Sequence, residues 1–131
     1  MDKYLIDTCI CIAMIKGNRQ VREQVAKVGY KNCYVSDITI AELLVGAEKS
    51  GKQKHFNDVS FVMKIFKVVP VSNQLSTYAK TRAYLELKGT RIEDFDLLIG
   101  ATAIQEKMVM VTANTKHFSR IPNIRLENWE L

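Results

Sequence analysis

Short apolar stretches alternate along the chain with longer stretches in which apolar and polar positions repeat at helical spacing. The short stretches predict strands, because turn-forming or polar residues bound them and they are too short for typical helices. The predicted strands cover residues 3–6, 33–35, 66–71, 108–112 and 124–127. The longer stretches predict helices over residues 8–16, 19–28, 38–49, 52–65, 72–88 and 95–106.

The order of these elements predicts the fold class. Strands separated by helices are typical of an α/β protein in which helices cover both faces of a parallel sheet. Four of the predicted helices are followed by a glycine, a residue that often ends a helix: Gly17, Gly29, Gly51 and Gly89. Thr8 is the predicted N-cap of the first helix. Because no repeat, linker or low-complexity tract interrupts the pattern, we expect one domain over residues 1–131 with a sheet of four to five strands.

Composition and charge narrow the class of protein only slightly. The chain has 131 residues, of which 47% are hydrophobic and 25% are charged, with a net charge of +5. Its lysines and arginines are scattered, so the charge permits an anionic partner without requiring one. No apolar stretch is long enough to span a bilayer, and the first residues do not resemble a secretion signal. We therefore expect a cytoplasmic protein with no membrane partner.

Three cysteines are present, at positions 9, 11 and 33. Their number is odd and none of their spacings is the CxxC of many metal and redox sites. A chain of this length can build an apolar core without cross-links, so we expect free, mostly buried thiols.

Three acidic residues lie in apolar surroundings. Asp7 directly follows the first predicted strand, at the edge of the sheet where α/β proteins bind ligands. Glu42 shares a helical face with apolar residues, and Asp96 lies in the first turn of an almost uncharged helix. Each acid alone has a structural explanation, such as a cap or an ion pair. Together they predict carboxylates that converge at one sheet edge with no lysine or arginine on the same helical face.

Converging carboxylates raise one another's pKa unless a cation lies between them. Sites made only of oxygen ligands favour hard cations such as Mg²⁺ or Mn²⁺. Such a metal can activate water and stabilise negative charge on a phosphate, which suits hydrolysis of a phosphodiester. The residues alone therefore indicate a metal-dependent phosphodiesterase, with Asp7, Glu42 and Asp96 as metal ligands and catalytic residues.

The same stretches resemble a known family. The chain is similar to PIN-domain ribonucleases of the VapC type, the toxins of bacterial toxin–antitoxin pairs. The resemblance covers nearly the whole chain and rests on five segments: LIDTCI (5–10), SDITIAELLVGAEKS (36–50), GTRIEDFDLLIGATA (89–103), MVTANTKHF (110–118) and RLENWEL (125–131). It implies a PIN-like fold, dependence on Mg²⁺ or Mn²⁺, cleavage of RNA with tRNA among the candidate substrates, inhibition by a VapB-type antitoxin, and a homodimer that also assembles with the antitoxin.

The matched motifs place the metal-binding acids of this family at Asp7, Glu42 and Asp96. Asp94 competes for the third role, although the DLLIGA match favours Asp96. Five further residues are candidates to support the site through hydroxyl, amide or imidazole groups: Thr8, Ser36, Thr112, Asn114 and His117. In this chain Cys9 stands where many relatives have Asn. The segment that usually carries a fourth acid offers only Asn114, as a ligand through its carbonyl or a water, and His117, which faces the phosphate or simply the surface.

Two other functions compete with the nuclease. A signalling receiver of similar length would need adjacent acids after its first strand, and this chain has one. A PIN module that has lost catalysis and only binds RNA or a protein partner is the stronger alternative, because the fourth acid is missing.

Overall fold

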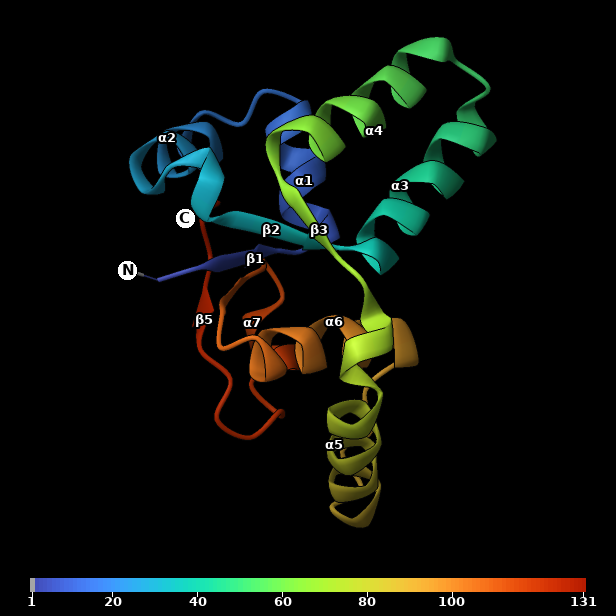
Figure 1. The fold of residues 1–131 in the computed structure, drawn as a ribbon, viewed down its shortest axis with the longest axis vertical. Helices are drawn as coiled ribbons and strands as arrows, with labels where there is room; N and C mark the ends of the chain where they lie inside the picture. Colours follow the sequence, from blue (N-terminus) through green and yellow to red (C-terminus); the bar gives the residue numbers. More distant parts are fainter. Residues whose placement is uncertain (1) are drawn as a thin grey trace.

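The computed structural model describes residues 2–131, and its centre is a five-stranded parallel sheet (Figure 1). The strand order is β3-β2-β1-β4-β5. The strands are β1 (Tyr4–Ile6), β2 (Cys33–Ser36), β3 (Lys67–Val69), β4 (Val109–Val111) and β5 (Leu126–Glu127). In the register, Leu5 of the central β1 lies opposite Tyr34 of β2 and Met110 of β4. The predicted α/β class, parallel sheet and strand number are confirmed.

Helices form a layer on each face of this sheet (Figure 1). One layer contains α1 (Thr8–Ile15), α2 (Arg19–Val28), α3 (Asp37–Ser50) and α4 (Gln53–Ile65). The other contains α5 (Leu75–Leu87), α6 (Asp94–Gln105) and α7 (Thr115–Phe118). Two short 3-10 turns, η1 (Tyr30–Asn32) and η2 (Val71–Gln74), lead into β2 and α5.

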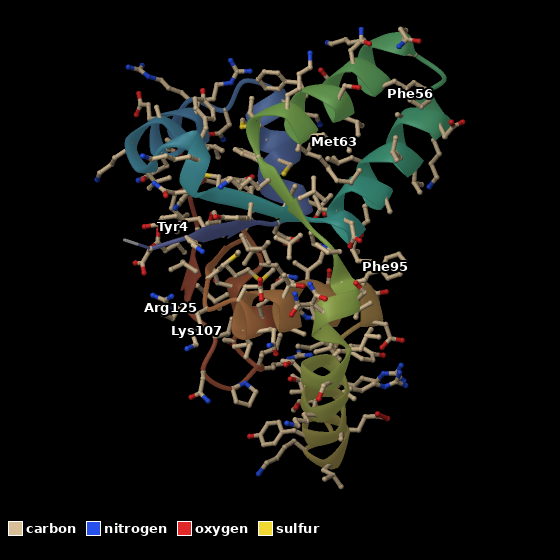
Figure 2. The ribbon with its side chains drawn as sticks, in the orientation of Figure 1. Tyr4, Phe56, Met63, Phe95, Lys107 and Arg125 are labelled. Carbon is tan, nitrogen blue, oxygen red and sulfur yellow. The ribbon has the colours of Figure 1, made fainter. Side chains whose placement is uncertain are left out.

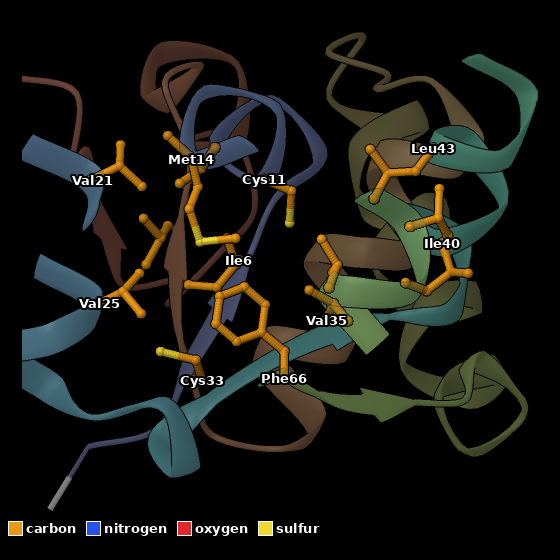
Figure 3. Packing of buried hydrophobic residues seen from close by; sticks show 14 of the residues in the cluster. Ile6, Cys11, Met14, Val21, Val25, Cys33, Val35, Ile40, Leu43 and Phe66 are labelled. Atoms are coloured by element: carbon orange, nitrogen blue, oxygen red, sulfur yellow. The ribbon is translucent and has the colours of Figure 1, made fainter. Parts of the chain in front are cut away.

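The sheet separates two apolar cores. Side chains alternate between the faces of a strand, so Ile6 packs in the core beneath α1 to α4 while Leu5 packs in the core against α5 and α6. Figure 3 shows the first core, in which Ile6, Val35 and Phe66 pack together. Because both faces of the inner strands are buried, their sequences are apolar without alternation, as the short apolar stretches predicted.

Several predicted element ends were wrong. The N-cap of α1 is Asp7 rather than Thr8, because the Asp7 carboxylate accepts a hydrogen bond from the backbone N–H of Thr8. The third strand and the following helix are both shorter than predicted, since residues 71–74 form η2. There the backbone N–H of Val71 donates to the Asp37 side chain at 3.2 Å instead of continuing the strand. The four-residue helix α7 was not predicted.

Within residues 2–131, no helix combines the length and apolar character needed to cross a membrane.

The packing of α5 predicts different costs for two leucines in the same helix. Leu85 is 1% exposed and Leu87 is 89% exposed. Leu85→Ala should lower the free energy of unfolding by about 2–5 kcal/mol, because it removes buried methyl groups and leaves a cavity. Leu87→Ala should change it by less than about 0.5 kcal/mol. Urea denaturation of both variants checks this, and equal losses would contradict the assignment of the second core.

Candidate active site

Asp7 lies at the carboxyl end of the central strand and is 7% exposed. Its backbone N–H donates to the carbonyl of Val111, which continues the pairing of β1 with β4. Its Oδ1 accepts the backbone N–H of Thr8 at 2.9 Å, and its Oδ2 accepts the hydroxyl of Thr112 at 2.8 Å. These bonds offset the cost of burying the carboxylate, which would be large without partners.

Glu42 reaches the same edge from the middle of α3. Its Oε1 accepts the hydroxyl of Thr8 at 2.7 Å, and that hydroxyl also lies 3.1 Å from Oγ1 of the buried Thr39. Thr8 therefore connects two of the predicted acids, since its N–H binds Asp7 and its hydroxyl binds Glu42. The sequence analysis did not identify Thr39, which lies one helical turn before Glu42 on the same face of α3.

Asp96 enters the site from the first turn of α6, with its side chain 32% exposed. Its Oδ2 lies 3.3 Å from Nε2 of His117 on α7. Burial raises the pKa of Asp96, the charges of Asp7, Glu93 and Glu42 raise it further, and His117 opposes the shift. Asp7, Glu42 and Asp96 are thus close enough to influence one another electrostatically, as the sequence analysis predicted.

Glu93 is a fourth acid beside this group, and sequence analysis missed it. It is the N-cap of α6, and its Oε2 accepts the backbone N–H of Asp96 at 3.3 Å. The available signal was its position three residues before Asp96 at the start of an apolar helix, which is the spacing of a helix cap. Its side chain contacts the backbone, so its direct role is to begin α6 and to place Asp96 in the first turn.

The donor chemistry of the site fits a hard divalent cation. Carboxylate oxygens are ligands that Mg²⁺ and Mn²⁺ accept, and the pKa of Asp96 is raised first by burial and then by the charge of Asp7. Among the described residues, however, no three acidic, histidine or cysteine side chains are already arranged around a common point. The fold brings the acids to one edge. In this structure the Thr8 hydroxyl binds Glu42, and His117 lies beside Asp96.

The predicted supporting residues divide into two groups. Thr8 contacts Asp7 and Glu42, Thr112 contacts Asp7, and His117 lies beside Asp96. Ser36 is fully buried and caps α3, accepting the backbone N–H of Ile38 at 3.1 Å. Asn114 is exposed at the start of α7, where its backbone N–H donates to the Thr112 hydroxyl. Ser36 and Asn114 therefore position the backbone around the site in this structure.

Asp94, the competing third ligand, has different partners. It lies 3.4 Å from Arg82 and 3.5 Å from Arg91, and it accepts the hydroxyl of Tyr78 at 3.0 Å. Its neighbour Phe95 is 47% exposed at the start of α6 (Figure 2). Residues two apart on a helix face different sides, so Asp94 is neutralised by cations while Asp96 faces the other acids.

Cys9 lies directly beside Asp7. Its Sγ is 3.6 Å from Asp7 Oδ2 and 3.9 Å from the Thr112 hydroxyl. Burial raises the pKa of the Cys9 thiol, and the charge of Asp7 raises it further. The protonated thiol is thus a weak donor to Asp7. All three cysteines are free, as predicted.

A groove of about 410 Å³ begins at Glu42 and runs between α1, α3 and α4. Apolar side chains from all three helices line it, among them Ile12, Leu43 and Val59. Lys16, Lys54, His55 and Asp58 add polar groups. The acidic site therefore continues into a partly apolar groove that is large enough for side chains of a partner.

Comparison with known proteins identifies the family. A family model described as PIN domain matches residues 4–124. The chain belongs to the PIN-domain family. Curated relatives place it beside the VapC ribonucleases of that family. Ribonuclease VapC2 of Rickettsia felis is 34% identical over 131 residues, covering 97% of this chain and 98% of that protein. The tRNA(fMet)-specific endonuclease VapC of Salmonella typhimurium is 34% identical over 132 residues, covering 98% and 99%.

Solved PIN-domain structures agree with this assignment. The fold superimposes with a TM-score of 0.87 on a chain of VapBC2 from Rickettsia felis bound to a DNA fragment from their promoter. That match has 35% identity and covers 96% of this chain and 98% of the other. DNA-bound VapBC from Salmonella typhimurium gives a TM-score of 0.85, with 32% identity and coverage of 98% and 99%. The resemblance to VapC-type PIN domains is confirmed.

The opposite surroundings of Asp94 and Asp96 predict opposite effects on stability. In EDTA near pH 7, Asp96→Asn should raise the free energy of unfolding by up to about 1 kcal/mol, because repulsion is relieved, and the melting temperature should rise with it. Asp94→Asn should lower the free energy of unfolding by a similar amount. The raised pKa means that native Asp96 keeps a proton that the unfolded chain has released. Wild-type stability therefore falls as pH rises from 3.8 through the native pKa. Asp96→Asn should reduce that fall.

Thermal melting of the three proteins between about pH 4 and pH 7 checks both signs. If Asp96→Asn were the less stable variant throughout, Asp96 would be a structural residue whose contact with His117 outweighs the repulsion.

Proposed function

We propose that this chain is a divalent-metal-dependent endoribonuclease, the toxin of a toxin–antitoxin pair that acts on RNA in the cytoplasm. The observation that carries the proposal is the convergence of Asp7, Glu42 and Asp96 at the carboxyl edge of a PIN-domain sheet. Its relatives are named ribonucleases or endonucleases, and its structural neighbours are VapBC assemblies. Because the Salmonella typhimurium relative is named a tRNA(fMet)-specific endonuclease, tRNA is the first RNA to test.

Asp7, Glu42 and Asp96 would hold Mg²⁺ or Mn²⁺. When bound, the ion supplies charge stabilisation at the scissile phosphate and lowers the pKa of a water. The protein contributes orientation. Thr112 and the Thr8 N–H fix both oxygens of Asp7, and the Thr8 hydroxyl holds one oxygen of Glu42 while leaving its second oxygen without a protein partner in the described structure. Nε2 of His117 lies 3.3 Å from Oδ2 of Asp96 and so contributes to the position of that carboxylate.

The alternative is a PIN module impaired in catalysis that binds RNA or a protein. The observation that favours it is His117, which stands in the segment where the family usually has an acid and forms a pair with Asp96. The cleavage assay below separates the two functions.

We expect the purified chain to cleave bulk tRNA in Mg²⁺ or Mn²⁺ and to stop in EDTA. Asp7→Asn, Glu42→Gln and Asp96→Asn should each lower the rate by about 100-fold or more, because charge stabilisation and water activation are lost together. The matched control is Asp94→Asn, which removes the same charge two residues from Asp96 and should keep activity within a few fold. Gel assays on folded variants measure this. A wild type that binds tRNA but never cuts it would support the impaired module.

We also propose that a VapB-type antitoxin inhibits the chain by laying an apolar helix or strand in the groove and presenting a basic side chain to the acids. An arginine there would place a bidentate cation where the metal would lie. The groove supports this because its wall on α3 begins at Glu42 and continues with apolar residues. Exposed apolar residues on α5, among them Leu75 and Leu87, offer surface for the homodimer that we further propose.

Gly46 provides a specific test of antitoxin binding. It lines the groove, and a methyl group placed on it meets no atom within 4 Å, so a side chain can start there without a clash at its Cβ. Gly46→Phe should fill the groove and weaken binding of a VapB-type antitoxin by at least about 10-fold. Val45→Phe, at a neighbouring position that is 53% exposed and does not line the groove, should bind normally. Calorimetry measures both, and equal affinities would rule out this groove.

A further inference from the structure

A basic residue lies at the start of each of the five parallel strands or within two residues before it. Lys3 directly precedes β1, Lys31 lies two residues before β2, and Lys67 is the first residue of β3. Lys107 lies two residues before β4, and Arg125 directly precedes β5. Parallel strands begin at the same edge, so these residues form a row in the order Lys67, Lys31, Lys3, Lys107 and Arg125, here called the basic row.

The basic row is exposed and mostly lacks counter-charges. All five residues are exposed. Arg125 is paired with Asp2 at 3.0 Å and also donates to the carbonyl of Lys107 at 3.1 Å. In the part of the chain that the structure describes, no carboxylate lies within 4.0 Å of any of the four lysine ammoniums. Figure 2 shows Lys107 and Arg125 together on one side of the molecule, near Tyr4.

Two of the lysines share one aromatic ring. The ammonium of Lys3 lies 5.7 Å from the centre of the Tyr34 ring, and that of Lys67 lies 5.6 Å from it. The ring, on β2, attracts each cation, but the two like charges, at the strands on either side of β2, repel one another. An anion that contacts both ammoniums would relieve this repulsion. The arrangement is therefore suited to a ligand with several negative charges.

We propose that the basic row binds the phosphate backbone of the RNA substrate outside the cleavage site. This inference rests on the proposed ribonuclease function. The row spans about 19 Å, from four strand spacings of about 4.8 Å, which corresponds to roughly five phosphates at about 3.4 Å each along one strand of a duplex. Lys3 and Asp7 are separated by the length of β1, about 13 Å. An RNA larger than this can contact the acids at one edge and the basic row at the other.

The test compares two triple variants that remove the same charge. The row variant carries Lys31→Gln, Lys67→Gln and Lys107→Gln. The control variant carries Lys49→Gln, Lys80→Gln and Lys88→Gln. Lys49 lies in α3, Lys80 lies in α5 and Lys88 directly follows α5, and all three are exposed. Fluorescence anisotropy with labelled bulk tRNA in EDTA measures the dissociation constant against salt concentration, and cleavage in Mg²⁺ measures KM and kcat.

The row variant should bind tRNA at least about 10-fold more weakly than the control at 0.1 M salt, with a salt slope lower by about 2, as expected for three lost phosphate contacts. Its KM for tRNA should rise with little change in kcat. Equal affinities and slopes for the two variants would overturn the proposal, as would a row variant that loses binding only to the antitoxin or to anionic vesicles. A wild type that binds tRNA through the row without cutting it would overturn the proposed function and leave this inference standing.

Discussion

The buried carboxylate of Asp7 is the group on which the rest of the site depends. The Asp7 side chain caps α1 by accepting the Thr8 N–H, and it accepts the hydroxyl of Thr112, the residue that follows β4. Its backbone N–H extends the pairing of β1 with β4. Burying an ionised carboxylate is costly without such bonds, and removing one partner would leave the charge unpaired. The fold is therefore organised locally around the Asp7 carboxylate, which joins the start of α1 to the end of β4.

The other two acids are held with less constraint, and this difference has a physical origin. Glu42 and Asp96 extend from helices, and each has a single side-chain partner, Thr8 or His117. Asp7 is fixed by the central strand, where the backbone has little freedom. A site with one rigid and two adjustable carboxylates can close around an ion without moving the sheet. It can equally accept a basic side chain of an inhibitor. Such a side chain is positively charged, as the ion is, but differs from it in shape.

Sequence reasoning predicted the elements better than their ends. Inner strands were found because burial on both faces makes them continuously apolar, and Asp7 and Asp96 were found because carboxylates are rare in such surroundings. The N-cap of α1 was misassigned because Thr8 is also a good cap, and only the backbone geometry shows that Asp7 accepts the bond. The turn at residues 71–74 depends on a bond to Asp37, 34 residues earlier, which no local pattern contains.

Within the site, the sequence could not anticipate contacts between distant elements. It placed Asp94 and Asp96 as alternatives, and the contact that favours Asp96 comes from α5, whose Arg82 pairs with Asp94. It left open whether His117 was a surface residue, and the packing of α7 against α6 put its imidazole beside Asp96. Thr39 and Glu93 carried no signal beyond ordinary helix positions. Except for Glu93, which binds the backbone three residues further on, each of these residues acts through a neighbour that is far away in sequence, so its role arises only when the chain is folded.

The parallel sheet separates basic and acidic residues to its two opposite edges, and this separation cannot be read from the net charge or the composition. Every strand begins beside a basic residue, and the predicted catalytic acids gather where strands end or where helices meet that edge. A net charge of +5 would by itself attract RNA without orienting it. With opposite charges at opposite edges, a polyanion is repelled from the acids and attracted to the other side. If the proposed metal binds the acids, its charge would lower this repulsion, so the same ion would also help the substrate to approach Asp7.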